Sequence, residues 1–76
     1  MERQKIPILD IHTAAFLDMR GYAPCLTKQG TRVVFDFPNS QSVLRAISIY
    51  NENPEVPLLD YVSRLRKLRA RMLAAR

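Results

Sequence analysis

A strict alternation of side chains along residues 31–37 predicts a strand. Val33, Phe35 and Phe37 occupy every second position of this segment, and Pro38 follows it. A period of two places these three side chains on one face of a strand, which we expect to be the core face. Proline has no amide to donate, so we expect the strand to end there.

Two further segments are expected to join this strand in an antiparallel sheet. Residues 22–27 read as the first arm of a hairpin, and residues 28–30 read as its turn, because Gly30 supplies the positive φ that a tight turn favours. Residues 5–9 look extended as well. Pro7 excludes a central position for them, so we predict a possible N-terminal third strand at an edge.

The first helix is predicted over residues 11–20. Asp10 is placed to cap it, since its carboxylate can accept hydrogen bonds from the amides of the first turn. Gly21 is placed to end it in the left-handed conformation. Apolar residues surround most of its circumference, which is typical of a buried helix.

A second helix is expected to begin at Asn39 or Ser40 and to run to about Tyr50. Residues 51–57 contain two prolines and read as a connection. A third helix is expected from Pro57 onward, a residue suited to a first helical turn. The apolar stripes of the two helices are Val43, Leu44, Ile47 and Tyr50 in the second, and Tyr61, Leu65, Leu68, Met72 and Ala75 in the third.

These elements predict an α+β fold in the order β-α-β-β-α-α, with a small antiparallel sheet packed against three helices. Seventy-six residues form a single domain, residues 1–76, and a hydrophobic content of 47% suits a globular chain. The expected core consists of Ile11, Ala15, Phe16, Leu26, Val33, Phe35, Phe37, Leu44, Ile47, Leu65 and Leu68.

The net charge changes this picture at the C-terminal end. Six of the twelve basic residues and none of the seven acidic residues lie in residues 61–76, so this segment carries +6 and residues 1–60 carry −1. At 100° per residue, one flank of the third helix presents Arg64, Lys67 and Arg71, and the other side presents Arg66 and Arg69.

Three interpretations of this basic helix stay open. It can contact phosphates of nucleic acid, or it can meet an acidic protein partner or an acidic lipid surface. It can also be a solvated structural helix in which Asp60 and Arg64 form an ordinary i,i+4 pair.

Catalytic and metal-binding chemistry is not indicated. His12 is expected to be a partly exposed helix residue, and Cys25 a small buried apolar residue. One cysteine and one histidine do not supply the usual four ligands of a zinc site, and Gly21 and Gly30 do not form a phosphate loop. We therefore predict no enzyme activity and no cofactor. No signal peptide and no membrane span are expected, so the predicted location is cytoplasmic.

Several short motifs follow one another in a recognisable order: residues 10–17, Gly21-Tyr22, residues 32–37, residues 50–53, Val56-Pro57, Tyr61 and Leu65 to Leu68. In their order and spacing they resemble a family of small bacterial domains of unknown function, the one numbered 5659. The resemblance covers about residues 8–73. It implies a shared fold and brings neither an activity nor an active site.

The expected function is a small non-catalytic module for protein interaction or self-association, with a protein partner or a homodimer. A domain of this size without disulfide or metal often gains stability by association. The alternative is a nucleic-acid-binding accessory protein that uses the basic helix. In either case the candidate contact residues are Arg64, Arg66, Lys67, Arg69 and Arg71.

Overall fold

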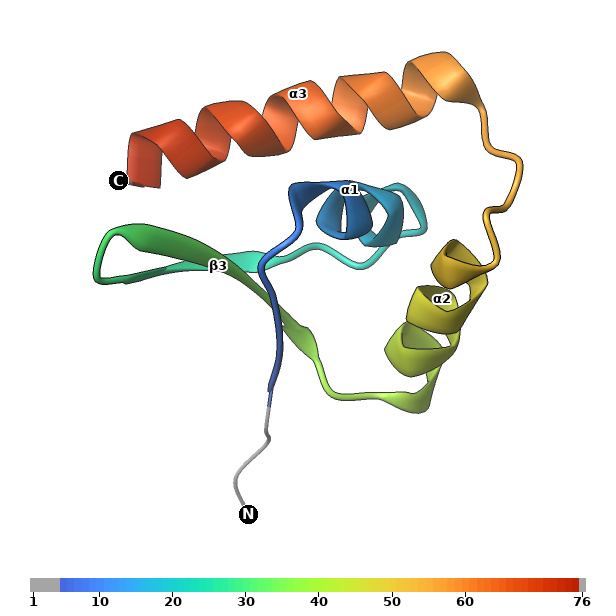
Figure 1. The fold of residues 1–76 in the computed structure, drawn as a ribbon, viewed down its shortest axis with the longest axis horizontal. Coiled ribbons are helices and arrows are strands. Elements are labelled where there is room, and N and C mark those ends of the chain that lie inside the picture. The colour runs from blue at the N-terminus through green and yellow to red at the C-terminus, as the bar shows by residue number, and fades with distance from the viewer. Residues whose placement is uncertain (1–4, 76) are drawn as a thin grey trace.

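The computed structural model describes residues 5–75 and confirms the predicted element order (Figure 1). Three strands and three helices follow one another as β-α-β-β-α-α. Their bounds are β1 Lys5–Ile8, α1 Ile11–Met19, β2 Cys25–Gln29, β3 Arg32–Pro38, α2 Gln41–Asn51 and α3 Leu58–Ala75.

The three strands form one antiparallel sheet in the order β1-β3-β2. The strand with the clearest alternation, β3, is therefore central, and Pro7 lies on an edge strand as predicted. Phe35 is the partner of Ile8 on one side and of Leu26 on the other. Since cross-strand partners share a face, these apolar side chains meet on the core face of the sheet.

The hairpin is tighter than the sequence suggested. Its ladder continues to the pair Gln29 and Arg32, which leaves only Gly30 and Thr31 in the turn. Gly30 has φ 63°, and Thr31 keeps a negative φ. A positive φ at the first of two central residues is typical of type II′, which matches the twist of the flanking strands. The predicted strand over 22–27 is thus displaced to β2.

Both ends of α1 are closed as predicted. The Asp10 carboxylate accepts from the backbone amide of His12 at the N-terminus. At the C-terminus the amide of Gly21 donates to the carbonyl of Asp18, and that of Tyr22 donates to Leu17, both at 3.0 Å. Gly21 has φ 98°. This pair of hydrogen bonds is the Schellman arrangement, which turns the chain sharply toward β2.

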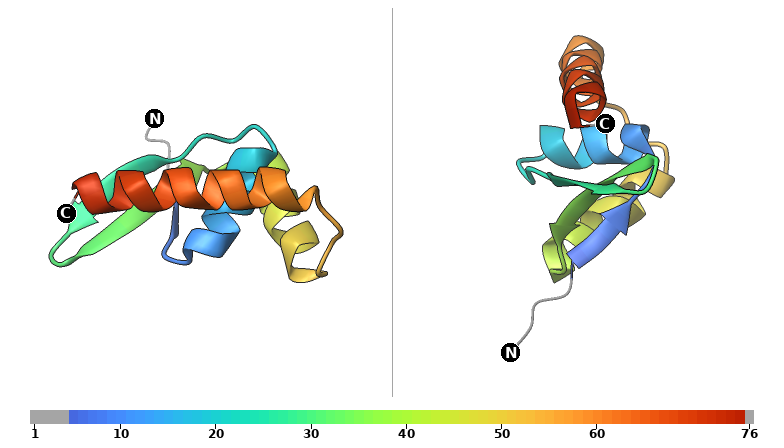
Figure 2. Two further views of the ribbon diagram at one scale, coloured as in Figure 1. Left: turned by 90° about the horizontal axis from the view of Figure 1, so that it is seen from above. Right: turned by 90° about the vertical axis from the view of Figure 1, so that its left-hand side faces the viewer.

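The core lies around α1, which is enclosed between the sheet on one side and α3 on the other (Figure 2). Its central residues are Ala14, Ala15, Leu17, Phe35, Phe37, Val43, Ala46 and Leu68. Phe16, Val33 and Val34 are also buried. Ile11, Leu26, Ile47 and Leu65 were expected in the core and are partly buried against it.

One core prediction is wrong. Leu44 is 50% exposed, while its neighbour Val43 and Ala46 are fully covered. Consecutive helical residues differ by 100°, so a helix that turns Val43 and Ala46 toward α1 and the sheet turns Leu44 away. The buried or partly buried stripe of α2 therefore includes Val43, Ile47 and Tyr50 as predicted, and Leu44 was wrongly included at its edge.

The prediction for Cys25 is also wrong, since this residue is exposed. Leu26 packs toward the core, so Cys25 points to the opposite face, where its partner is Asp36. Val34 lies on that same outer face but is only 3% exposed. Val34 belongs to the central strand β3, whereas Cys25 belongs to the edge strand β2.

The connection between α2 and α3 is short and restricted. Asn53 adopts the left-handed conformation with φ 57°, and its amide donates to the carbonyl of Tyr50 at 3.1 Å. Pro54 and Pro57 follow within the same connection. The carbonyl of Pro57 then accepts from the amide of Tyr61, which opens α3.

Candidate interaction surface on α3

The basic helix α3 is the outermost layer of the molecule. Figures 1 and 2 show it lying across α1, with the sheet on the far side of α1. Leu68 is its one fully buried residue, and the predicted stripe is otherwise partly buried against the core. One long face of this helix therefore meets no other element of the described chain.

Two of the predicted contact residues are engaged within the domain. The Arg64 guanidinium lies 3.5 Å from the carboxylate of Asp18 in α1. The Arg71 guanidinium donates to the carbonyl oxygen of Pro24, also at 3.5 Å. Arg64 thus forms its ion pair with Asp18 of α1, and not the i,i+4 pair with Asp60 that the interpretation as a solvated structural helix included. Lys67, between them in sequence, is exposed.

The other predicted cations, Arg66 and Arg69, lie among exposed apolar residues. Leu59 is 83% exposed and Leu73 is 54% exposed, and Val62 is half-buried. Together these residues form what we call the outer seam: Leu59, Val62, Arg66, Arg69 and Leu73. The spacing of the seam alternates between three and four residues, which keeps its members within a sector of about 80° on the helix.

The three- and four-residue spacing of the outer seam is present in the sequence, but two of its five positions are arginines, so it does not read as an apolar stripe. In the sequence, Arg66 and Arg69 were interpreted only as cations, and Leu59 and Leu73 were not part of the predicted stripe. The outer seam lies a quarter turn or more around the helix from the core stripe. It can be separated from that stripe because the structure shows that Leu68 marks the buried face.

A hollow lies at the start of α3, between this helix and the end of α2. It has a volume of about 470 Å³ and is lined by residues that include Phe16, Tyr50, Asn53 and Tyr61. The rings of Phe16 and Tyr50 are 5.5 Å apart at 52°, an ordinary tilted packing. The lining consists of apolar, aromatic and amide side chains, so its tyrosines are the titratable groups in it.

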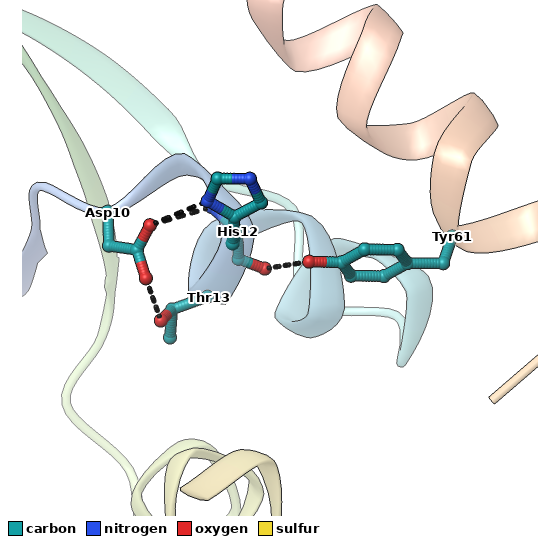
Figure 3. Close-up of polar contacts among 4 residues, drawn as sticks. All are labelled: Asp10, His12, Thr13 and Tyr61. Atoms are coloured by element: carbon teal, nitrogen blue, oxygen red, sulfur yellow. Dashed lines mark hydrogen bonds and ion pairs between the residues drawn. The ribbon is translucent and has the colours of Figure 1, made fainter. Parts of the chain in front are cut away.

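The most connected polar cluster of the described chain joins the start of α1 to α3 (Figure 3). The Asp10 carboxylate accepts from the Thr13 hydroxyl at 2.9 Å and lies 3.1 Å from Nδ1 of His12. The Tyr61 hydroxyl donates to the backbone carbonyl of His12 at 3.1 Å. His12 is exposed, as predicted. This cluster fixes the beginning of α1 and ties α3 to it.

Two pKa values in this cluster depart from their ordinary values. Partial burial acts to raise the pKa of Asp10, but hydrogen bonds from His12 and Thr13, with the charge of His12, outweigh it and lower this pKa. Burial raises the pKa of Tyr61, and the neighbouring Tyr50 and Asp10 raise it further. Tyr61 therefore stays protonated at neutral pH and keeps its donor.

Asp10→Ala is expected to lower the free energy of unfolding by about 1–2 kcal/mol, because the helix cap and the acceptor of the nearly buried Thr13 hydroxyl are both lost. Since the pKa of Asp10 is lower in the folded state, its stabilisation is complete above the ordinary value of 3.8 and is lost as the pH falls through the folded value. Urea unfolding at pH 7 and at pH 3 measures both effects.

The matched control is Asp10→Asn, which keeps a cap acceptor and removes the titration. It should stay near wild type at pH 7 and lose less stability on acidification than wild type does. An Asp10→Ala variant that is as stable as wild type at pH 7 would contradict the capping role.

The part of the chain that the structure describes contains neither a candidate metal site nor a helix suited to cross a membrane. No group of three or more His, Cys, Asp or Glu side chains within residues 5–75 is placed to hold a metal ion. None of the helices in that range has the length and apolar character that crossing a membrane requires.

No curated protein matches the chain, and no solved structure does. Residues 3–74 match the family described as Domain of unknown function (DUF5659), in agreement with the resemblance of the motifs. This match spans nearly the whole sequence, and the chain therefore belongs to the DUF5659 family.

Proposed function

We propose that this protein is a small non-catalytic protein-interaction module that binds its partner through the outer seam of α3. The observation that carries the proposal is the exposure of Leu59 and Leu73 on a helix whose opposite face is already packed. Each exposed leucine leaves apolar surface in water, and its burial against a partner is favourable by at most about 1.5–3 kcal/mol, the value for a side chain that goes from full exposure to full burial. The cytoplasmic location expected from the sequence remains a prediction.

The spacing of the seam supports a helical or groove-shaped contact. The seam runs from Leu59 to Leu73 on the 18-residue helix α3, a distance of about 21 Å at 1.5 Å per residue. A row of this length suits a small, reversible interface better than an obligate one. Arginine is enriched at interfaces, and here Arg66 and Arg69 occupy the middle of the row.

Nucleic-acid binding is the second candidate, because Arg66, Lys67 and Arg69 are exposed within one turn of α3. Such a cluster would give weak binding that depends steeply on salt. Two facts favour the protein partner. Arg64 and Arg71, two of the five expected phosphate contacts, have partners within the domain, and phosphate binding gives no reason to expose leucines beside the arginines.

The test compares immobilised wild-type protein with a Leu59→Glu/Leu73→Glu double variant in capture of partners from an extract of the source cells. We expect wild type to retain a partner in a stoichiometric amount, and the double variant to lose about tenfold or more of it, because two apolar anchors are removed. Ser63→Glu is the matched control, since this exposed residue of α3 lies outside the seam. Circular dichroism and thermal melts verify the fold of each variant.

Equal capture by wild type and the double variant would contradict the proposed surface. Wild type and an Arg66→Gln/Arg69→Gln variant are also titrated into labelled DNA and RNA at about 150 mM salt. Binding that survives this salt and disappears in Arg66→Gln/Arg69→Gln would replace the protein-interaction proposal with the nucleic-acid alternative.

A further inference from the structure

The middle of the outer seam is charged, and both of its ends are apolar. Leu59 and Leu73 lie at the ends, and Arg66 and Arg69 lie between them. We infer that the seam is built for a partner helix that carries acidic residues between apolar ones, and that it disfavours a second copy of this chain. This inference rests on the proposed interaction through α3 and specifies the chemistry of the partner.

The spacing favours a helix as the occupant. Side chains that alternate three and four residues apart form the contact row of a helix packed nearly parallel to another, as in a coiled coil. The outer seam repeats this spacing from Leu59 to Leu73 without a break. A partner helix would place one apolar residue against each terminal leucine and its central residues against the two arginines.

Self-pairing brings like charges together in either orientation. In a parallel pair with Leu59 against Leu59, Arg66 faces Arg66 of the copy. In an antiparallel pair with Leu59 against Leu73, the two-fold axis again places Arg66 against Arg66. Like charges in directly opposing positions are unfavourable, so a second copy gains the leucine contacts only together with this repulsion.

Acidic residues on the partner opposite Arg66 and Arg69 would replace this repulsion with attraction. Arginine binds a carboxylate through two parallel hydrogen bonds, which also fixes the register of the two helices. The surroundings add positive potential, because residues 61–76 carry no acidic residue. A partner with glutamate or aspartate in the middle of its apolar row is therefore the complement of the seam in both shape and charge.

The test uses a charge-reversed copy of the protein, Arg66→Glu/Arg69→Glu, as the acidic partner helix. This copy keeps the same leucines, and we expect it to keep the fold because both substituted side chains are exposed. Sedimentation velocity compares wild type alone, the double variant alone and an equimolar mixture at low and at physiological salt. We expect association in the mixture to be at least about tenfold tighter than self-association of either protein.

Two further variants make the result specific to the seam. Adding Leu59→Glu to the wild-type arm should abolish association in the mixture, because it removes an end contact. The variant Lys67→Glu changes one exposed cation about 100° away from the middle of the seam, and a mixture of it with wild type should stay monomeric. Higher salt should weaken the association in the mixture.

Absence of association in the mixture would overturn the inference, and so would self-association of wild type that Leu59→Glu abolishes. Neither result depends on capture of a cellular partner. If the mixture stays monomeric while capture still requires Leu59 and Leu73, the partner is not an acidic helix, but the interaction surface stands. If both experiments fail, the proposed function fails with the inference.

Discussion

Replacing Phe35 by alanine is expected to lower the free energy of unfolding by about 3–5 kcal/mol. Phe35 is fully buried on the central strand, between Ile8 and Leu26 and beneath α1, so little of the surroundings can move to fill the cavity. A domain of this size has a total stability of about 5 kcal/mol. The variant should therefore keep only about 0–2 kcal/mol of stability and melt at a much lower temperature than wild type, which thermal melts by circular dichroism will measure.

Leu9→Ala serves as the control for this substitution. Leu9 is another large apolar residue close to the sheet, but more than half of its surface is exposed. It should change the free energy of unfolding by less than about 1 kcal/mol. Similar melting midpoints for the Phe35→Ala and wild-type proteins would remove Phe35 from the core.

The second large effect is expected for Leu68→Ala, at about 2–5 kcal/mol. Leu68 is the fully buried residue of α3, and three polar contacts around it hold the same helix: Arg64 with Asp18, Arg71 with Pro24, and Tyr61 with His12. Exposed contacts of this kind contribute little alone. Loss of the apolar anchor should therefore loosen the whole helix, and urea unfolding measures the loss.

The comparison with Leu73→Ala separates anchoring from partner binding. Leu73 belongs to the same helix but lies in the outer seam, so its removal should leave the unfolding midpoint nearly unchanged. Leu68→Ala should weaken partner capture only as far as α3 itself is lost, whereas Leu73→Ala should weaken it in a folded protein. Equal effects of the two variants on stability would contradict this division of the helix into two faces.

The local elements were predictable because short-range chemistry determines them. Asp10 and Gly21 close α1 at its two ends through hydrogen bonds that span no more than five residues, and both residues were identified from the sequence. The alternation around Phe35 likewise fixed the core face of β3. The third strand at the N-terminus was expected on weaker grounds, and its antiparallel pairing with β3 is confirmed.

Tertiary placement accounts for the errors. Leu44 and Val43 are equally apolar, and only the angle at which α2 meets the core decides which of them is covered. Arg64 has a carboxylate within its own helix, yet Asp18 of α1 is its partner because α3 crosses α1 there. The seam could not be separated from the core stripe for the same reason, since the sequence of an amphipathic helix does not show which apolar face is the covered one.

The connection around Asn53 also affects how the domain folds. Among residues with a side chain, asparagine is one of the few that adopt the left-handed conformation readily. Pro54 and Pro57 restrict the backbone even in the unfolded chain. Less conformational entropy is therefore lost when this segment becomes ordered. This lowers the entropic cost of packing α3 against α1, which matters because Leu68 is the one fully buried side chain of α3.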